Sequence, residues 1–158
     1  MFREMIRKAK QLPECEVIDI LRNQKRGVLS IQGDDGYPYG MPMNHFYNEE
    51  DGCIYFHQGN VGYRLEKLRE DDHVSFCTYD EGVVVPGDWA LTVKSVIVFG
   101  RIEIIEDPET MADITRKLSY KFTQDDAYID EEIKNSLRRT IVLKLVPEYM
   151  TGKIVNEK

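Results

Sequence analysis

Residues 56–68, FHQGNVGYRLEKL, carry the side chains best suited to hold an anion. They read as a strand end, a glycine-bearing loop and the start of an amphipathic helix. The first turn of a helix offers free backbone N–H groups, Gly59 and Gly62 let the backbone come close to a ligand, and Arg64 can form paired bonds to phosphate oxygens. The segment therefore indicates an anion site, although its spacing is also that of an ordinary strand-to-helix turn with a solvated arginine.

A second candidate is the strand-like segment YPYGMPMNHFY, whose two prolines interrupt the donors of a β-ladder. At Pro38 and Pro42 the strand must face a sheet edge, a bulge or a ligand, because proline has no N–H. Neighbouring backbone groups, such as those of Met43 and Asn44, are then free to meet a planar heteroaromatic edge, and Met41 and Met43 place thioethers on one face. The alternative is that the methionines fill gaps in the core and Asn44 caps a turn.

Other kinds of site are not indicated. The chain has no HxH or HExxH spacing for a metal and no GxSxG motif for a nucleophilic serine. Its acidic clusters lie in expected turns, where carboxylates are common without a catalytic role. We therefore expect no metal and leave the catalytic residues open. The groups concerned are His45, His57 and His73, and the clusters 34–35 and 49–51.

The composition limits the partners and the compartment. The chain has 158 residues, 21 of them basic and 28 acidic, for a formal net charge of -7 and a sequence pI near 5.0. This balance argues against a general nucleic-acid binder, which needs a basic surface. Cys15, Cys53 and Cys77 form neither a CxxC motif nor an even set, and no apolar run approaches the ~20 residues of a membrane span. We expect a soluble protein of the cytoplasm.

Short strands separated by Asp/Gly turns must position these candidates. GVLSIQ, YPYGMPMNHFY and CIYFH predict three consecutive antiparallel strands, followed by the helix that contains Arg64 and a strand over residues 73–79. LTVKSVIVFGRIEIIED predicts a strand pair or one strand bent at Gly100, and Asp107-Pro108 is typical of a helix start. The pattern predicts a mainly β fold with peripheral helices, a closed or split antiparallel barrel of roughly six strands.

The length predicts a single domain over residues 1–158. We expect an N-terminal covering helix within residues 1–23 and a barrel core over 27–106. A helical segment over 107–138 and a final strand and tail over 139–158 complete the expected order.

Two longer segments, GDDGYPYGMPMNHFYNEEDGCIYFHQGNVGYRLEKLREDDHVSFC and SVIVFGRIEIIEDPE, together resemble a known family. They are similar to the flavin-nucleotide-binding members of the pyridoxamine 5'-phosphate oxidase-like split-barrel superfamily, close to its nitroimidazole-resistance branch. The match runs from about Gly27 to Pro108 and continues more loosely to MTGK. The resemblance implies a six-stranded antiparallel split β-barrel that binds FMN at the interface of a homodimer.

The resemblance also implies which residues contact the cofactor. The strand from Met41 to Asn44 would line the isoalloxazine, and the strand end would lie beside the ribityl phosphate. The phosphate would sit at the helix start, where Arg64 replaces the usual lysine. The strand start after residue 93 often approaches the flavin, and Trp89 could reach it across the interface. The implied contacts are Met41, Pro42, Met43, Asn44, Phe56, His57, Gly62, Tyr63, Arg64, Trp89, Lys94 and Ser95.

The chain departs from the vitamin-B6 oxidases of this superfamily. Those enzymes have a basic residue where this chain has Met41 and another where it has Tyr63, and they end in a substrate-binding Trp and Arg segment that is absent here. We therefore do not expect oxidation of pyridoxamine 5'-phosphate. The leading hypothesis is an FMN-dependent oxidoreductase that reduces a small planar nitroaromatic- or quinone-like substrate through flavin N5, with Tyr63, His45 and His57 as candidate proton donors.

Two alternatives remain open on the sequence. One is a non-catalytic flavin- or haem-binding module with a carrier, storage or sensing role, in which His57 or His45 would be the axial ligand. The other is a deazaflavin protein, which would need a more basic groove than this chain offers. The physiological substrate and electron donor cannot be read from the sequence, because fold and cofactor do not fix a reaction.

Overall fold

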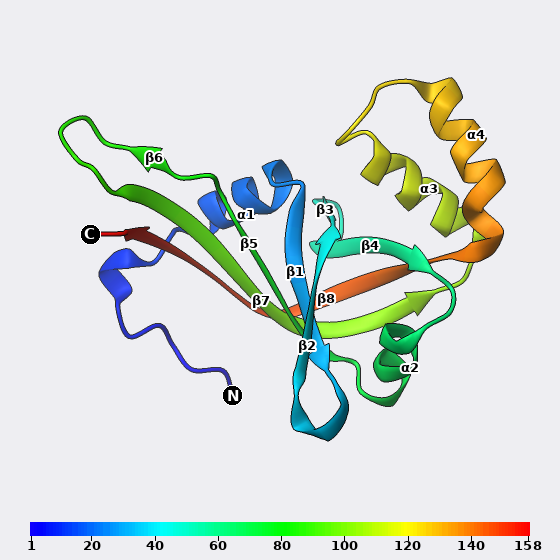
Figure 1. The fold of residues 1–158 in the computed structure, drawn as a ribbon, viewed down its shortest axis with the longest axis horizontal. Coiled ribbons are helices and arrows are strands. Elements are labelled where there is room, and N and C mark those ends of the chain that lie inside the picture. Colours follow the sequence, from blue (N-terminus) through cyan, green and yellow to red (C-terminus); the bar gives the residue numbers. More distant parts are fainter.

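The computed structural model describes residues 1–158 as one antiparallel sheet of eight strands with α-helices packed around it (Figure 1). The strands are β1 (Arg26–Gln32), β2 (Pro38–Asn44), β3 (Phe46–Asn48), β4 (Cys53–Gly59), β5 (His73–Tyr79), β6 (Val83–Val84), β7 (Leu91–Ile105) and β8 (Thr140–Asn156). The helices are α1 (Glu14–Asn23), α2 (Tyr63–Glu70), α3 (Pro108–Ser119) and α4 (Asp126–Ser136). None of them is both long and apolar enough to cross a membrane.

The sheet runs in the order β2-β1-β5-β7-β8-β4-β3, and β6 pairs only with β7. The long strands β7 and β8 pair along almost their whole length, and their register shifts between Phe99 and Gly100. A side chain at Gly100 would lie 2.2 Å from the carbonyl oxygen of Val146, so only glycine fits this close approach. The bend predicted at Gly100 is thus confirmed as a β-bulge within one long strand.

The mainly β split-barrel fold with peripheral helices is confirmed, with two short strands beyond the six expected. The segment YPYGMPMNHFY divides at His45 into β2 and β3, which pair with different neighbours. His45 is fully buried, and its Nε2 donates to the carbonyl oxygen of Leu21 at 2.8 Å. β6 is a two-residue strand in the stretch between the strand predicted over residues 73–79 and the one predicted from Leu91.

The main core lies between the sheet and the helices α1 and α2. It combines alternate residues of the strands with the apolar stripe of α1 (Val17, Ile20 and Leu21) and with Leu65 and Leu68 of α2. A smaller cluster lies beneath α3 on the other side of β4, and it contains Cys53, Tyr55, Met111, Ile114 and Val142. The expected cap is confirmed, because the Asp107 carboxylate accepts from the backbone N of Thr110 at 2.8 Å, just before Pro108.

β2 lies at the edge of the sheet, in agreement with its prolines. The Gly33 N–H donates to the Tyr37 carbonyl at one end of the β1–β2 pair, and the His45 N–H donates to the Lys25 carbonyl at the other. Backbone groups point alternately to the two sides of a strand, so the odd-numbered residues of β2 face β1. The even-numbered residues face the open edge, and these are Pro38, Gly40, Pro42 and Asn44. The prolines therefore remove no bond from the ladder.

Candidate functional site

Arg64 stands in the first turn of α2, half-buried and without a carboxylate partner. Its Nη1 lies 2.9 Å from the sulfur of Met43, and its Nε is buried without any hydrogen-bond partner. Burial lowers the pKa of Arg64, although a guanidinium stays charged at any ordinary pH. A buried cation that lacks a counter-charge favours an anion beside it.

A hollow of about 170 Å³ opens next to this guanidinium. This Arg64 hollow is lined by Tyr39, Gln58, Gly59, Val61, Gly62, Tyr63, Arg64 and Leu65. Gln58 is buried in the wall, and its Oε1 has no hydrogen-bond partner. Arg64 and Gln58 thus leave a donor and an acceptor unsatisfied on one small hollow, which suits a polar ligand.

Sequence reasoning missed Gln58 and Tyr39. Gln58 follows His57 on β4, and alternation along a strand places it on the same face as the core residue Phe56. A buried polar residue in phase with an apolar stripe was the available signal. Tyr39 had no such signal, because it is an exposed aromatic residue on an edge strand.

Gly62 and Tyr63 shape the entrance of the hollow. Gly62 has φ +120°, which a side chain would strain, and it immediately precedes α2. The Tyr63 hydroxyl accepts from the backbone N–H of Asp34 at 2.9 Å, and its ring meets Tyr39 edge-on with centroids 5.2 Å apart. These contacts hold the β1–β2 turn against α2, beside Arg64.

The four predicted residues of β2 divide between its two sides. Met43 is buried and contacts Arg64, while Met41 packs partly buried against the same core. Both therefore fill the core, as the alternative interpretation has it, and Met43 also reaches the hollow. Pro42 and Asn44 face the open edge, where the Asn44 Oδ1 accepts from Arg26 Nε at 3.0 Å.

Phe56 and His57 are not brought to Arg64. Phe56 is fully buried and packs edge-on against Phe76, with centroids 5.2 Å apart. The side chain of His57 alternates to the opposite face of β4, the face that carries Tyr55 beneath α3. Both residues lie near the expected strand end, but within the single chain neither side chain lines the Arg64 hollow.

Lys94 and Ser95 lie at the α1 end of β7. Lys94 Nζ is 2.6 Å from the carboxylate of Glu16 on α1, and this ion pair raises the pKa of Lys94. The surrounding Lys94 crevice, about 250 Å³, also contains Asp19 and Asp80. Ser95 alternates to the outer side of the sheet. Within one chain, the structure does not bring either residue to Arg64.

Trp89 lies in the loop between β6 and β7, which extends away from the sheet (Figure 1). Its side chain is 81% exposed and makes no contact with the Arg64 hollow. Of the predicted residues, it is the one most available to another molecule.

His45 is a poor candidate for proton transfer. Its imidazole is fully buried, and burial together with the nearby ammonium of Lys121 lowers its pKa to about 3. Its Nδ1 has no partner, and the Nε2–H is bound to the Leu21 carbonyl. His45 therefore stays neutral and out of reach of a ligand in the hollow.

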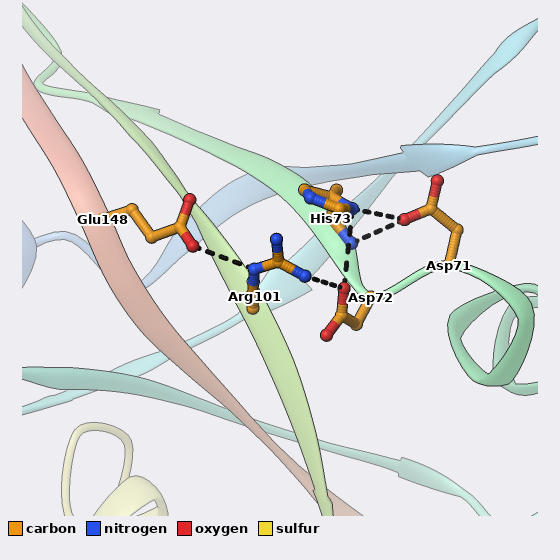
Figure 2. Close-up of polar contacts among 5 residues, drawn as sticks. All are labelled: Asp71, Asp72, His73, Arg101 and Glu148. Carbon is orange, nitrogen blue, oxygen red and sulfur yellow. Dashed lines mark hydrogen bonds and ion pairs between the residues drawn. The ribbon is translucent and has the colours of Figure 1, made fainter. Parts of the chain in front are cut away.

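A network of charged side chains lies where β5 begins and β7 bends (Figure 2). Arg101 is 2.9 Å from both Asp72 and Glu148, and the Nδ1 of His73 is 2.7 Å from Asp71. Ligand atoms of Asp71, Asp72 and His73 lie within 4.8 Å of one another. Because Arg101 already compensates Asp72, the network is explained by ion pairing and gives no ground for a metal site.

Several solved structures are similar to this chain over most of its length. A 5-nitroimidazole resistance candidate from Bacteroides thetaiotaomicron superposes with a TM-score of 0.79 at 24% identity, over 92% of this chain and 87% of that one. A FAD-binding protein from Mesorhizobium loti superposes with a TM-score of 0.65 at 20% sequence identity, over 92% of this chain and 97% of that one. A FAD- and haem-binding protein from Mycobacterium smegmatis superposes with a TM-score of 0.74 at 18% sequence identity, over 94% of this chain and 74% of that one.

At these identities the solved structures establish a shared fold. No curated protein matches the chain. The family model described as pyridoxamine 5'-phosphate oxidase matches residues 13–154, which is most of the sequence. The chain therefore belongs to the pyridoxamine 5'-phosphate oxidase family that this model describes.

Proposed function

We propose that this protein is a flavoprotein that binds FMN, with the phosphate in the Arg64 hollow and the ring system along the open edge of β2. The observation that carries the proposal is the half-buried guanidinium of Arg64, which has no carboxylate partner in a chain with 28 acidic residues. The family match and the flavin-binding proteins among the similar structures support the cofactor class.

The hollow fits a phosphate group. The buried Nε of Arg64 is a donor that no protein atom uses, and Gln58, whose Oε1 has no partner, can turn its amide nitrogen toward a second oxygen. The first turn of α2 adds backbone N–H groups and the positive end of its dipole. None of these groups carries a negative charge, which suits a phosphate dianion.

The open edge of β2 fits the pyrimidine side of a flavin, which alternates acceptors with an N–H donor. Gly40 and Asn44 present N–H groups at this edge, and Pro38 and Pro42 present only carbonyls. Backbone donors fixed against the ring favour the negative charge that a flavin acquires on reduction. When bound, the flavin supplies hydride or electron transfer at N5.

We further propose a homodimer, formed through the outer side of β1, β5 and β7. Val28, Ile97 and Phe99 are each more than a third exposed there, and Val28, Cys77 and Ile97 lie side by side across the three strands. The charged network around Arg101 borders this apolar area, which is the usual anatomy of an interface. Trp89, exposed within its own chain, is then available to cover the flavin of the second copy.

The reaction we propose is reduction of a small planar substrate, such as a nitroaromatic or a quinone, by the bound flavin. The protein's part is to hold the phosphate at Arg64, fix the ring against β2 and leave one ring face accessible. Tyr63, whose hydroxyl accepts from the Asp34 backbone N–H and keeps its own proton, remains the candidate proton donor beside the hollow, because His45 is enclosed in the core.

Titrations with FMN and riboflavin test the phosphate assignment, because the two ligands differ only in the phosphate. We expect the protein to bind FMN about 100-fold more tightly than riboflavin. We expect Arg64→Leu to abolish that preference while leaving riboflavin affinity unchanged. A colourless preparation that binds neither ligand would overturn the proposal, and a preference that survives in Arg64→Leu would move the phosphate elsewhere.

Size-exclusion chromatography with light scattering tests the dimer. We expect about twice the chain mass for the native protein, and a monomer for Ile97→Lys. Asn135→Lys, on exposed α4, is the charge-matched control and should leave the mass unchanged. A native monomer would refute the dimer without affecting the phosphate assignment.

A further inference from the structure

A wide groove lies on the outer side of β1, away from the Arg64 hollow. It has a volume of about 960 Å³ and is open to solvent. This Lys25 groove is lined by Asn23, Gln24, Lys25, Arg26, Gly27, Val28, Pro42, Tyr79, Glu81 and Phe122. It draws on the end of α1, three strands and the turn that follows α3, and its Val28 also borders the surface proposed for the dimer.

Two exposed cations in the groove lack a carboxylate partner. Lys25 forms no ion pair, and Arg26 uses its Nε to donate to the neutral Asn44 Oδ1 at 3.0 Å, which leaves its terminal nitrogens free. The lining contains one carboxylate, Glu81, which is exposed and is paired with neither of them. By contrast Lys94, in the neighbouring crevice, is held 2.6 Å from Glu16.

A third cation lies directly behind these two. Lys121 Nζ donates to the carbonyl oxygens of Gln24 and His45, at 2.5 and 2.9 Å, and again meets no carboxylate. Its half-buried ammonium adds positive potential at the wall formed by Gln24 and Lys25. In a chain of net charge -7, this local excess of positive charge favours an anion.

Aromatic rings border the cations. Phe122 is 43% exposed, and the ammonium of Lys25 lies 5.3 Å from the centroid of its ring. Tyr79, on the same groove, is 62% exposed. Exposed aromatic faces beside cations bind a flat ring that carries a negative charge, because the ring stacks while the charge meets the cations.

We propose that the Lys25 groove binds a small aromatic anion of the aromatic carboxylate class. The carboxylate meets Lys25 and Arg26, and the ring packs against Phe122 and Tyr79. Pro42 lines the groove and also belongs to the open edge of β2. On the proposed function, and resting on it, the bound acid would lie beside the flavin as a substrate or a competitor of one.

Isothermal titration calorimetry with 2-naphthoate tests the binding, with neutral 2-naphthamide as the ring-matched control. The protein is first freed of any flavin, so the result does not depend on the proposed function. We expect one 2-naphthoate per chain, bound at least tenfold more tightly than 2-naphthamide. We expect Lys25→Gln and Arg26→Gln each to weaken 2-naphthoate at least fivefold, and Phe122→Leu to weaken both ligands.

Lys134→Gln removes an exposed, unpaired cation on α4 and serves as the matched control, with no expected change. Equal affinity for the two ligands, or 2-naphthoate binding that ignores both Lys25→Gln and Arg26→Gln, would overturn the proposal. So would the lack of any binding at millimolar 2-naphthoate. In protein loaded with flavin, a shift of the visible spectrum on adding 2-naphthoate is expected, and its absence would refute the neighbouring position alone.

Discussion

The Arg64 hollow and the Lys94 crevice each contain a cation that the sequence assigns to the flavin, and they differ in what surrounds it. Lys94 faces Glu16, with Asp19 and Asp80 in the same crevice. Arg64 faces a thioether, a buried amide and open space. The difference teaches that the identity of a basic residue predicts little about anion binding until its partner is known, since a paired cation has its charge already compensated.

An unpartnered buried polar atom is not always a place for a ligand, and His45 is an exception in this chain. Its Nδ1 is also unpartnered, but the side chain is fully enclosed and its pKa is lowered to about 3. As the pH falls from 6.5 to 4, His45 therefore becomes protonated in the unfolded chain but stays neutral in the folded one. This lowers the free energy of unfolding by about 3 kcal/mol as the pH falls through that window.

Denaturant unfolding at several pH values checks this first prediction. His45→Phe removes the titrating group, so its stability should fall less steeply between pH 6.5 and 4 than that of the native protein. Val85→Phe places the same side chain at an exposed position that carries no ionisable group, and as the control it should keep the native slope. Parallel slopes for His45→Phe and the native protein would show that His45 is not the group concerned.

The second prediction concerns Arg64 itself. Arg64→Leu should raise the dissociation constant of FMN about 100-fold, or ~3 kcal/mol, because charged donors to the phosphate are lost. The free energy of unfolding should not fall, since the substitution removes a buried nitrogen that has no partner. Arg69→Leu, on the exposed side of the same helix, should leave FMN affinity unchanged, and an equal loss in both variants would break the comparison.

Gln58→Leu should have a smaller effect in the same direction. Loss of one neutral amide donor to the phosphate should raise the dissociation constant of FMN about tenfold. Stability should be retained, because the Oε1 that disappears is unpartnered. Fluorescence titration measures the affinity and thermal unfolding the stability. A destabilised variant with unchanged FMN affinity would make Gln58 a purely structural residue.

The smallest effect is expected at Lys94. Lys94→Met should change FMN affinity less than about threefold, and it should cost at most ~1 kcal/mol of stability because the ion pair with Glu16 is partly exposed. The same titration checks it, with Glu16→Gln as the matched variant. A loss of affinity comparable to that of Arg64→Leu would mean that Lys94 exchanges Glu16 for the flavin, and the contrast between the two sites would collapse.

Local features of the fold were predictable because they depend on neighbouring residues. Asp107 and Pro108 start α3 through their own chemistry, Gly100 marks the bulge, and the prolines of β2 identify an edge strand. Arg64 follows from the glycine-bearing turn before α2 in the same way. In each of these cases the physical cause lies within a few positions of the residue that carries it.

The remainder depends on contacts that sequence spacing does not reveal. Glu16 lies 78 positions from Lys94, so no local pattern indicates their pairing. The burial of His45 divides one expected strand into two, and the alternation of β4 separates His57 from Gln58. The candidate site was thus predictable in its location and only partly in its members.

The prolines of β2 also protect the chain against aggregation through its open sheet edge. An open sheet edge is a template to which the strand of another molecule can add, and this leads to aggregation. Pro38 and Pro42 present no donor at that edge, so an added strand would miss bonds at alternate positions. The edge along which we propose that the flavin lies therefore also discourages growth of the sheet by a polypeptide.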